Sequence, residues 1–243
     1  MEFKANFLGS LIVDAVFYGS HFFFFHVIFS FVNELGEFSA QDVQIFLIIT
    51  FLSDTFYMLL FSGNLFNLNR MIVRGDLDFV LLKPINAQFM ASFRYVKSYT
   101  LISLAILTLL FIRIISTGGY HLHWINVVVF LYSFFLGLSI WYSFDFIIGC
   151  FSFWAKNFTV GGWLSHEVMK FSLRPDSIYT GFLRRTLFSV IPMALIMSIP
   201  TRMLLYDISY VYLGVQTLVA VVFLVLTRIV WRFGLKRYES ASS

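Results

Sequence analysis

The chain has 243 residues and a net charge of +4; 59% of its residues are hydrophobic and only 12% are charged. This charged share is about half that of an average soluble domain, and a water-soluble globule of this size could not bury so much apolar surface. The composition therefore excludes an ordinary soluble domain and favours a protein that uses the lipid bilayer as its solvent. The single cysteine, Cys150, excludes an internal disulfide and a metal site made of several cysteines.

The first apolar run, Phe7 to Val32, predicts a retained membrane helix rather than a cleavable signal peptide. Such a peptide has a basic start and an apolar region of about 7–15 residues. Here the start carries Glu2 beside Lys4, and the apolar run is longer than that. We therefore expect this segment to be the first membrane span.

Six segments are long and apolar enough to cross the bilayer as helices, which takes about 20 residues each. We place them at 8–32, 44–66, 98–116, 125–151, 186–206 and 209–231. The predicted fold class is all-α: one polytopic membrane domain of six transmembrane helices over residues 1–243. Two longer polar-rich segments, 67–97 and 152–185, connect some of the spans.

The lysine and arginine residues are distributed unevenly between the two sides of this topology. Of the 17, 15 lie in the N-terminus, in the segments 67–97 and 152–185, and in the tail that begins at the end of the last span. The other side has only Arg113 and Arg202, together with acidic residues. Because short loops rich in lysine and arginine stay in the cytoplasm, we predict that both termini and both long segments are cytoplasmic.

The stretch 158–182 is neither a clear span nor a clear loop. Residues Val160–Phe171 mix apolar side chains with histidine, glutamate and lysine, and they are too few to cross the bilayer. We predict an interfacial helix or a cytoplasmic elbow here. The turn Arg174-Pro175-Asp176 ends it, because proline disfavours helix in the residue that precedes it.

Five ionisable residues fall inside the predicted spans, where inserting a carboxylate costs about 2.5–3.5 kcal/mol. They are Asp14, His21, His26, Asp54 and Asp145. Such residues are expected to face the bundle interior or a polar cavity. The three aspartates are our candidates for a translocation path or a proton relay. The alternatives are structural hydrogen bonds between helices and, near the span ends, simple solvation.

The spacing of the histidines argues against a metal site. His21 and His26 are five residues apart, which puts them about 140° apart around a helix, so they cannot share one ligand face. His121 and His123 lie beside Trp124 in a short turn without a third ligand nearby. That arrangement is more typical of the aromatic belt at a membrane interface. We expect this chain to bind no metal.

The sequence contains none of the common catalytic motifs that we considered. No lysine follows a glycine, so the phosphate-binding G-x-x-x-x-G-K-[ST] loop is absent, and neither H-E-x-x-H nor G-x-S-x-G occurs. We therefore expect that the chain is not an enzyme and binds no cofactor itself. Any use of ATP requires a site on another chain. An intramembrane enzyme that uses Asp54 or Asp145 is a minor alternative.

The segment 67–97 carries the pattern of a short amphipathic helix. Gly75 and Asp76 predict its start, because an aspartate side chain can accept hydrogen bonds from the first free amides. The apolar residues at i, i+3 and i+4 share one face; they are Leu77, Val80 and Leu81. Lys83-Pro84 predicts its end. Such a helix either lies on the membrane surface or docks into a groove of a cytoplasmic partner.

The same segment resembles the hallmark of bacterial ABC-2 type permeases, in the motif R-G-D-L-D-F-V-L-L-K-P-I-N at Arg74–Asn86. Further similarity lies at Pro175–Pro200, where P-D-S-I-Y-T-G-F-L-R-R leads into V-I-P-M-A-L-I-M-S-I-P. It continues in the tail W-R-F-G-L-K-R-Y-E-S-A-S-S, Trp231–Ser243, and in A-N-F-L-G-S-L near the start. One departure is the short N-terminus, which almost lacks the basic amphipathic helix common before the first span.

The resemblance implies a six-helix membrane subunit of an ABC exporter in the bacterial cytoplasmic (inner) membrane. Such a subunit pairs with a second permease chain, either a related paralogue or a copy of itself. Two ATPase subunits bind the ATP and Mg. The helix between the second and third spans would be the coupling helix that docks into the ATPase. Its residues are Arg74, Gly75, Asp76, Leu77, Asp78, Phe79, Leu81, Leu82, Lys83 and Pro84.

The composition favours an amphiphilic or lipophilic substrate over a small inorganic ion, because 20% of the residues are aromatic and few charges lie within the spans. The alternative function is a non-transport membrane scaffold or assembly protein that uses the same helix to dock a cytoplasmic partner. Under both hypotheses the chain contacts membrane lipid, and under neither does it bind nucleic acid.

Overall fold

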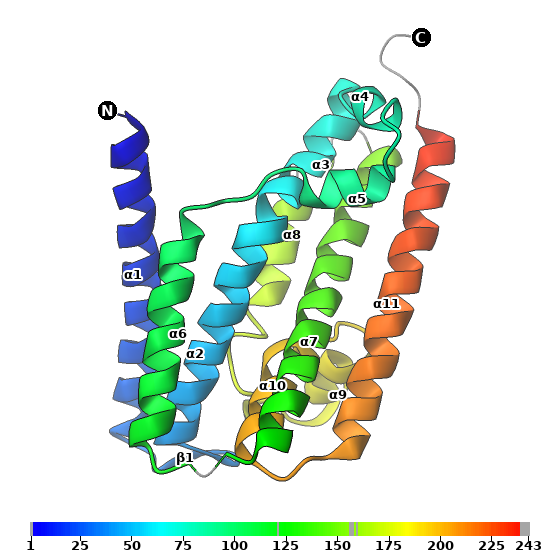
Figure 1. Ribbon diagram of the computed structural model, residues 1–243. Coiled ribbons are helices and arrows are strands. Elements are labelled where there is room, and N and C mark those ends of the chain that lie inside the picture. Colours follow the sequence, from blue (N-terminus) through cyan, green and yellow to red (C-terminus); the bar gives the residue numbers. More distant parts are fainter. Residues whose placement is uncertain (1, 121, 156–157, 159, 239–243) are drawn as a thin grey trace.

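The computed structural model describes residues 2–120, 122–155, 158 and 160–238. They form long helices that run side by side along one axis, with two short strands at one end (Figure 1). Within these residues, five helices are long and apolar enough to cross a membrane, or six if one bent pair is counted as a span. This confirms the predicted all-α polytopic fold. His121, Lys156 and the last five residues of the tail motif lie outside the described residues.

Both ends of the chain lie at the same end of the bundle, which we call the N/C end (Figure 1). From there α1 (Glu2–Phe29) runs to the opposite end. We call that the hairpin end, because β1 (Glu34–Leu35) and β2 (Phe38–Ser39) pair there as an antiparallel hairpin. The turn between them is tight, and Gly36 takes a left-handed conformation there (φ +66°) that glycine adopts without strain.

After the hairpin, α2 (Ala40–Tyr57) begins at a capping box. The Ser39 hydroxyl accepts a hydrogen bond from the Asp42 amide, and the Asp42 carboxylate accepts one from the Ser39 amide. The helix continues through a π turn (Met58–Ser62) into α3 (Gly63–Arg74). One helix of 35 residues therefore leads back to the N/C end.

The second helix thus extends beyond the predicted span 44–66, and the start of the predicted connecting segment 67–97 is helical. The reason is that its sequence is amphipathic. Leu68, Met71 and Ile72 are buried against the protein while the arginines between and after them are exposed. A helix can continue outside the hydrocarbon when one apolar face packs on other elements.

The next elements lie at the N/C end and then cross the bundle twice. α4 (Asp78–Leu81) and α5 (Ala87–Phe93) are short helices at the N/C end. α6 (Thr100–Thr117) runs to the hairpin end, and α7 (Trp124–Cys150) returns through the middle of the bundle to a 3-10 turn, Phe151–Phe153.

From α8 to α10 the structure departs most from the predicted topology. α8 (Val160–Met169) enters the bundle from the N/C end beside α7. The chain then continues to the hairpin end, where the Ser177 hydroxyl donates a hydrogen bond to the Leu35 carbonyl at 3.0 Å. α9 (Gly181–Ser189) and α10 (Ala194–Leu205) lie in the half of the bundle near that end and meet at an angle of 90°.

The predicted span 186–206 is therefore broken into two short helices, and the segment 152–185 reaches the hairpin end instead of staying at the N/C end. Pro192 lies in the break between α9 and α10, where its ring and missing amide stop a helix from continuing. α10 alone has 12 residues, about 18 Å, which is too short to cross the bilayer. α11 (Tyr210–Arg237) then runs from the hairpin end to the N/C end.

A buried group of charges holds this segment to the hairpin. Arg202 of α10 is only 7% exposed and donates hydrogen bonds to Asp176 (3.0 Å) and to Glu37 (2.5 Å). Arg184 of α9 donates to the other oxygen of Asp176 at 2.8 Å. Buried charges persist when each is paired in this way, and the Arg202 guanidinium holds the pKa of Glu37 below its usual value. This pairing places Arg184 at the hairpin end, whereas the prediction put it on the same side as the two termini.

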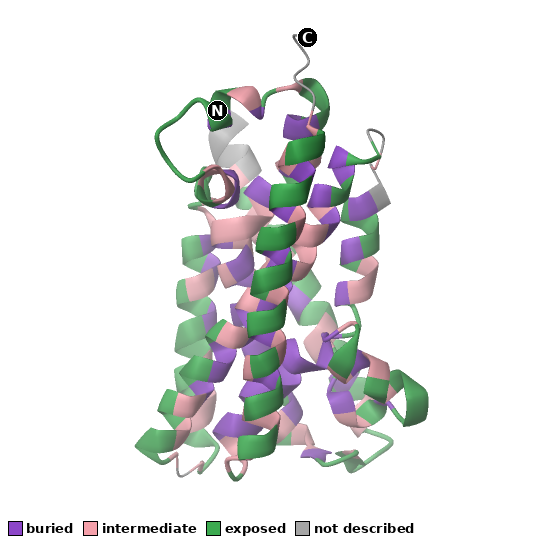
Figure 2. Ribbon diagram, turned by 90° about the vertical axis from the view of Figure 1, so that its right-hand side faces the viewer, coloured by how far each residue is buried: buried purple, intermediate pink, exposed green. Residues whose placement is uncertain are grey.

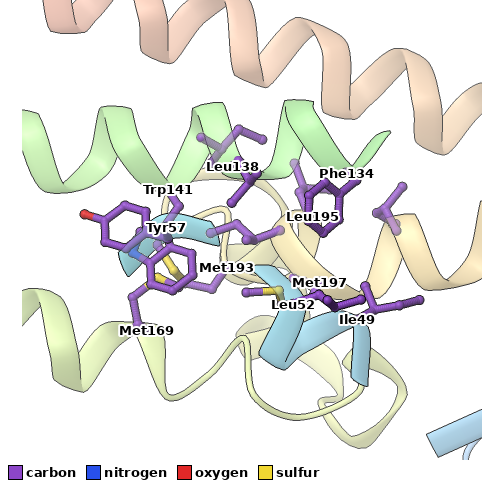
Figure 3. Packing of buried hydrophobic residues seen from close by; sticks show 14 of the residues in the cluster. Ile49, Leu52, Tyr57, Phe134, Leu138, Trp141, Met169, Met193, Leu195 and Met197 are labelled. Atoms are coloured by element: carbon purple, nitrogen blue, oxygen red, sulfur yellow. The ribbon is translucent and has the colours of Figure 1, made fainter. Parts of the chain in front are cut away.

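The core lies between α2, α7 and α10, where α10 is buried over almost its whole length. Figure 3 shows Leu138 of α7 close to Leu195 of α10. A Cβ on Gly137 would lie 2.4 Å from the Ile196 carbonyl oxygen, so glycine lets these two helices approach closely. The outer sides of α1, α6 and α11 expose apolar residues, as expected of surfaces that face lipid. Figure 2 shows the exposed outer side of α11, which faces the viewer.

Replacing Gly137 by alanine is expected to destabilise the protein by about 1–3 kcal/mol, the usual cost of overpacking a tight contact. The obstacle is the main chain of Ile196, which cannot move unless α10 shifts. Gly214→Ala in α11 is the matched control, since a Cβ there meets no atom within 4 Å. Thermal unfolding of the purified proteins measures the difference. Equal melting temperatures for the two variants would contradict the close contact.

Cysteines introduced at Leu82 and Arg185 are expected to react from opposite sides of the membrane. Both residues are exposed; Leu82 follows α4 at the N/C end, whereas Arg185 belongs to α9 near the hairpin end. The buried Cys150 is replaced by alanine so that each variant has one thiol. An impermeant thiol reagent, applied to sealed vesicles of known orientation, reports the side. Labelling of both from one side would support the predicted topology instead.

Candidate functional site

A cleft of about 600 Å³ lies between α1, the α2–α3 helix, the N/C half of α7, and α8. Asp14 of α1, Asp54 of α2 and Asp145 of α7 all line it. The structure thus brings together, from three helices, the three aspartates that the sequence singles out. A cleft of this size, apolar in most of its lining and with a few polar groups, is typical of a site for a small molecule.

Asp145 accepts hydrogen bonds from two hydroxyl groups of neighbouring helices. The donors are Tyr57 of α2 and Ser165 of α8. The Tyr57 ring also stacks on Trp141, one turn before Asp145, with ring centroids 4.0 Å apart (Figure 3). One carboxylate therefore joins α2, α7 and α8 and fixes the shape of the cleft where they meet.

Asp54 and Asp14 are also held by hydroxyl groups. The Tyr18 hydroxyl of α1 donates to Asp54 at 3.2 Å and lies 3.0 Å from the Thr55 hydroxyl. Because a phenol has one proton, Thr55 is the donor in that second contact. Asp14 accepts from the Ser103 hydroxyl of α6 at 3.0 Å. These bonds connect α1 to α2 and to α6 on the other side of the cleft.

Basic groups lie near these carboxylates without pairing with them. Among the described residues, no basic side chain forms an ion pair with any of the three aspartates. His166 and Arg70 line the cleft, and Arg70 lies on α3 near the N/C end. Burial lowers the pKa of Lys97, while the charges of Asp54 and Asp14 act in the opposite direction. Among the described residues, hydrogen-bond donors rather than ion-pair partners therefore hold these carboxylates.

The π turn at Met58–Ser62 forms part of the cleft wall. Met58 and Ser62 both line the cleft, directly after Tyr57. A π turn adds a residue to one helical turn and often marks a functional position in a helix. Here it separates the part of the helix that carries Asp54 from the part that leads to α4.

The predicted coupling helix, Arg74–Pro84, which we call the docking segment, lies at the exposed N/C end, but its local structure differs from the prediction. Gly75 has φ +81° and ends α3 instead of starting the next helix, and α4 is a single turn that begins at Asp78. A residue with positive φ cannot continue a helix, so glycine terminates α3 there. Asp76 lies between the two helices and lines a shallow hollow with Arg70 and Arg94.

The buried and exposed faces of this segment also differ from the predicted ones. Leu77 and Val80 are fully buried, as expected of one apolar face, whereas Leu81 is 41% exposed. Phe79 and Leu82 are 68% and 82% exposed. The exposed residues of the segment, polar and apolar together, are Arg74, Asp76, Phe79, Leu81, Leu82, Lys83 and Pro84. Large apolar side chains held on a short helix at the surface are typical of a docking site for another protein.

The end of α11 is a neighbour of this segment that the sequence does not indicate. Burial and the nearby Asp78 carboxylate raise the pKa of Tyr238, which follows α11, to about 12. Gly234 lies against the Phe153 ring, where a Cβ would come within 2.2 Å of it. The docking segment therefore rests near α11 as well as on α3.

Among the described histidines, only His166 lines the cleft that contains the aspartates. The His21 ring lies 2.9 Å from the carbonyl oxygen of Phe17 in the preceding turn, and His26 is exposed. His123 directly precedes α7. Among the described residues, no three histidine, cysteine, aspartate or glutamate side chains are grouped as metal ligands would be.

The fold and the cleft define the class of the protein: a multi-pass helical membrane protein. A family model described as ABC-2 family transporter protein matches residues 15–242, and the chain belongs to this family. It is therefore a permease subunit of an ABC transporter, and the family implies an ABC ATPase subunit as its partner. This confirms the family that the sequence motifs resemble. No curated protein and no solved structure matches the chain.

Replacing Tyr57 by phenylalanine is expected to destabilise the protein by about 1–3 kcal/mol, because the buried Asp145 carboxylate loses a hydroxyl donor. Tyr132→Phe is the control: its hydroxyl pairs with Thr217 at an exposed position, so its loss costs less. Thermal unfolding compares the two variants. In an Asp145→Asn background, Tyr57→Phe should lower the melting temperature by less, since the stability effects of substitutions at two residues in contact are not additive. An unchanged effect there would show that the two groups do not interact.

Proposed function

We propose that this chain is the membrane permease of an ATP-driven exporter that moves an amphiphilic or lipophilic substrate out of the bacterial cytoplasm. The observation that carries the proposal is the continuous helix α2–α3. It lines the cleft with Asp54 and Tyr57, and it ends at the docking segment. A force on the docking segment therefore acts on a wall of the cleft.

In this proposal the N/C end faces the cytoplasm, so both termini are cytoplasmic. Basic residues gather at that end, as the positive-inside rule requires. They are Arg70, Arg74, Lys83 and Arg94 around the docking segment, and Arg228, Arg232, Lys236 and Arg237 along the end of α11. At the hairpin end, Arg184 and Arg202 are paired with carboxylates and count less as free positive charge, so Arg113 and Arg185 are weighed there against the eight basic residues named at the N/C end.

In the proposed transport cycle, the α2–α3 helix moves as one unit against the other helices that line the cleft. The cleft continues along α3 through Phe66, Asn69 and Arg70, so this conformation opens toward the N/C end. ATP and Mg bind to two ATPase subunits, since this chain has no phosphate-binding motif. Closure of those subunits on ATP pushes α4, and α2–α3 moves as a rigid body against α7 and α8. A second permease chain, a paralogue or a copy of this one, covers the open side of the cleft.

A non-transport scaffold would use the same docking segment and leave the cleft without a role. The ATP hydrolysis of the partner distinguishes the two functions. When a scaffold binds its partner, substrate has no effect on ATP hydrolysis. A permease transmits the state of the cleft to the ATPase.

Phe79→Ala and Leu82→Ala together are expected to abolish co-purification of the ATPase subunit and its substrate-dependent ATP hydrolysis. Both side chains are exposed and contribute little to the fold, so the melting temperature of the isolated chain should not change. Phe31→Ala is the matched control, because Phe31 is 84% exposed and lies between α1 and β1, away from the docking segment. Pull-down and ATPase assays on the reconstituted complex measure both effects.

If the double variant still assembled with the ATPase and hydrolysed ATP at the unaltered rate, the docking assignment would be wrong. Loss of assembly in the Phe31 variant as well would indicate a general requirement for exposed apolar surface rather than a specific docking site.

A further inference from the structure

The chemistry of the cleft selects between classes of amphiphilic ligand. It is a cavity of about 600 Å³ whose lining includes carboxylates from three different helices, Asp14, Asp54 and Asp145. Each accepts hydrogen bonds from hydroxyl groups, and among the described residues none is paired with a basic side chain. The protein therefore places three carboxylates in a largely apolar site and forms no ion pair with them among the described residues.

Positive groups that face the cleft do not remove this excess. Arg70 lies toward the N/C mouth and donates to Asn67 at 2.6 Å. His166 lines the wall next to Asp145. Lys97 lies behind the π turn, where a Cβ on Gly63 would be 3.4 Å from its Cε atom, and it is not part of the cleft lining. The deep part of the cleft therefore favours a positive ligand.

The apolar lining fits the remainder of such a ligand. Phe17, Phe66 and Phe158 contribute aromatic rings, and the stacked pair Tyr57 and Trp141 forms the wall next to Asp145. Aromatic faces attract a cation electrostatically and also bury its apolar groups. An anion would meet three carboxylates instead.

We propose that this cleft binds an amphiphilic organic cation, with its charged centre between the carboxylates of Asp54 and Asp145 and its apolar body against the aromatic wall. This deepens the proposed function by naming the class of substrate, and it rests on that function only for the step of transport. Binding itself requires this chain alone.

Two lipophilic ions of nearly equal size and shape test the sign of the charge. Tetraphenylphosphonium is a permanent cation, and tetraphenylborate is its anionic counterpart. Each is titrated calorimetrically into the full chain purified in a neutral detergent, with empty micelles as the blank. The cation is expected to bind at least about tenfold more tightly than the anion. Equal affinities, or tighter binding of the anion, would overturn the proposal.

Substitutions then locate the binding charge. Asp54→Asn should weaken tetraphenylphosphonium binding about tenfold, and Asp54→Glu should retain most of the affinity. Asp207→Asn is the control, since Asp207 is an exposed acid outside the cleft and near the hairpin end. Asp14→Asn is a second test in case the Asp54 variant does not give monodisperse protein, because Asp14 is less buried than Asp54. Unchanged affinity in the cleft variants, or an equal loss in the Asp207 variant, would overturn the assignment.

Failure of this proposal can be distinguished from failure of the proposed function. If Phe79 and Leu82 couple the chain to the ATPase but the cation does not bind, the ligand class is wrong and the permease role stands. If the cation binds but those residues have no effect on the ATPase, the docking assignment is wrong and the cleft chemistry stands.

Discussion

Inside the hydrocarbon of a bilayer there is no water, so each buried polar group of this protein has to find its partner within the protein. That requirement fixes helices that apolar packing alone would allow to slide along one another. Asp145 joins α2, α7 and α8 through two hydroxyl groups. Arg202 joins α10 to Asp176 and to the hairpin. Gln216 of α11 accepts from the Ser133 hydroxyl of α7 and donates to the Leu195 carbonyl of α10 at 2.8 Å. Each of these polar groups connects three segments.

Some of these bonds are also part of the functional site. Tyr57 and Ser165 donate to Asp145 and line the cleft, so α2 cannot separate from α8 without loss or exchange of a buried hydrogen bond. A site of this kind has discrete arrangements rather than a continuous range, because an unpaired polar group in an apolar place is costly. A ligand or a partner that supplies a replacement for one of these bonds can therefore shift the balance between two states.

The sequence predicts the helices and the aspartates of the cleft for the same physical reason, which is the cost of polar groups in lipid. It does not predict the partners of those aspartates, because serine and tyrosine hydroxyls occur throughout the chain and Tyr57 lies 88 residues from Asp145. The placement of Arg184 fails for a related reason. A count of positive charges treats every arginine as solvated, whereas Arg184 is neutralised by Asp176 at the hairpin end. Gly75 is misread because a glycine between two helices can end the first as well as start the second.

The length of α6 shows where the hydrocarbon ends along α2–α3. α6 has 18 residues, about 27 Å, so Thr100 at its start lies near the boundary on the N/C side. Just before it, the Lys97 amide donates to the Leu59 carbonyl at 3.1 Å, which puts the π turn at the same level. The 12 residues of α3, about 18 Å, then project beyond the hydrocarbon toward the docking segment. Asp54 comes five residues before Leu59 and therefore lies about 8 Å inside the hydrocarbon. The π turn is therefore at the crossing point, and a tilt of α3 about that point would move Asp54 in the opposite direction.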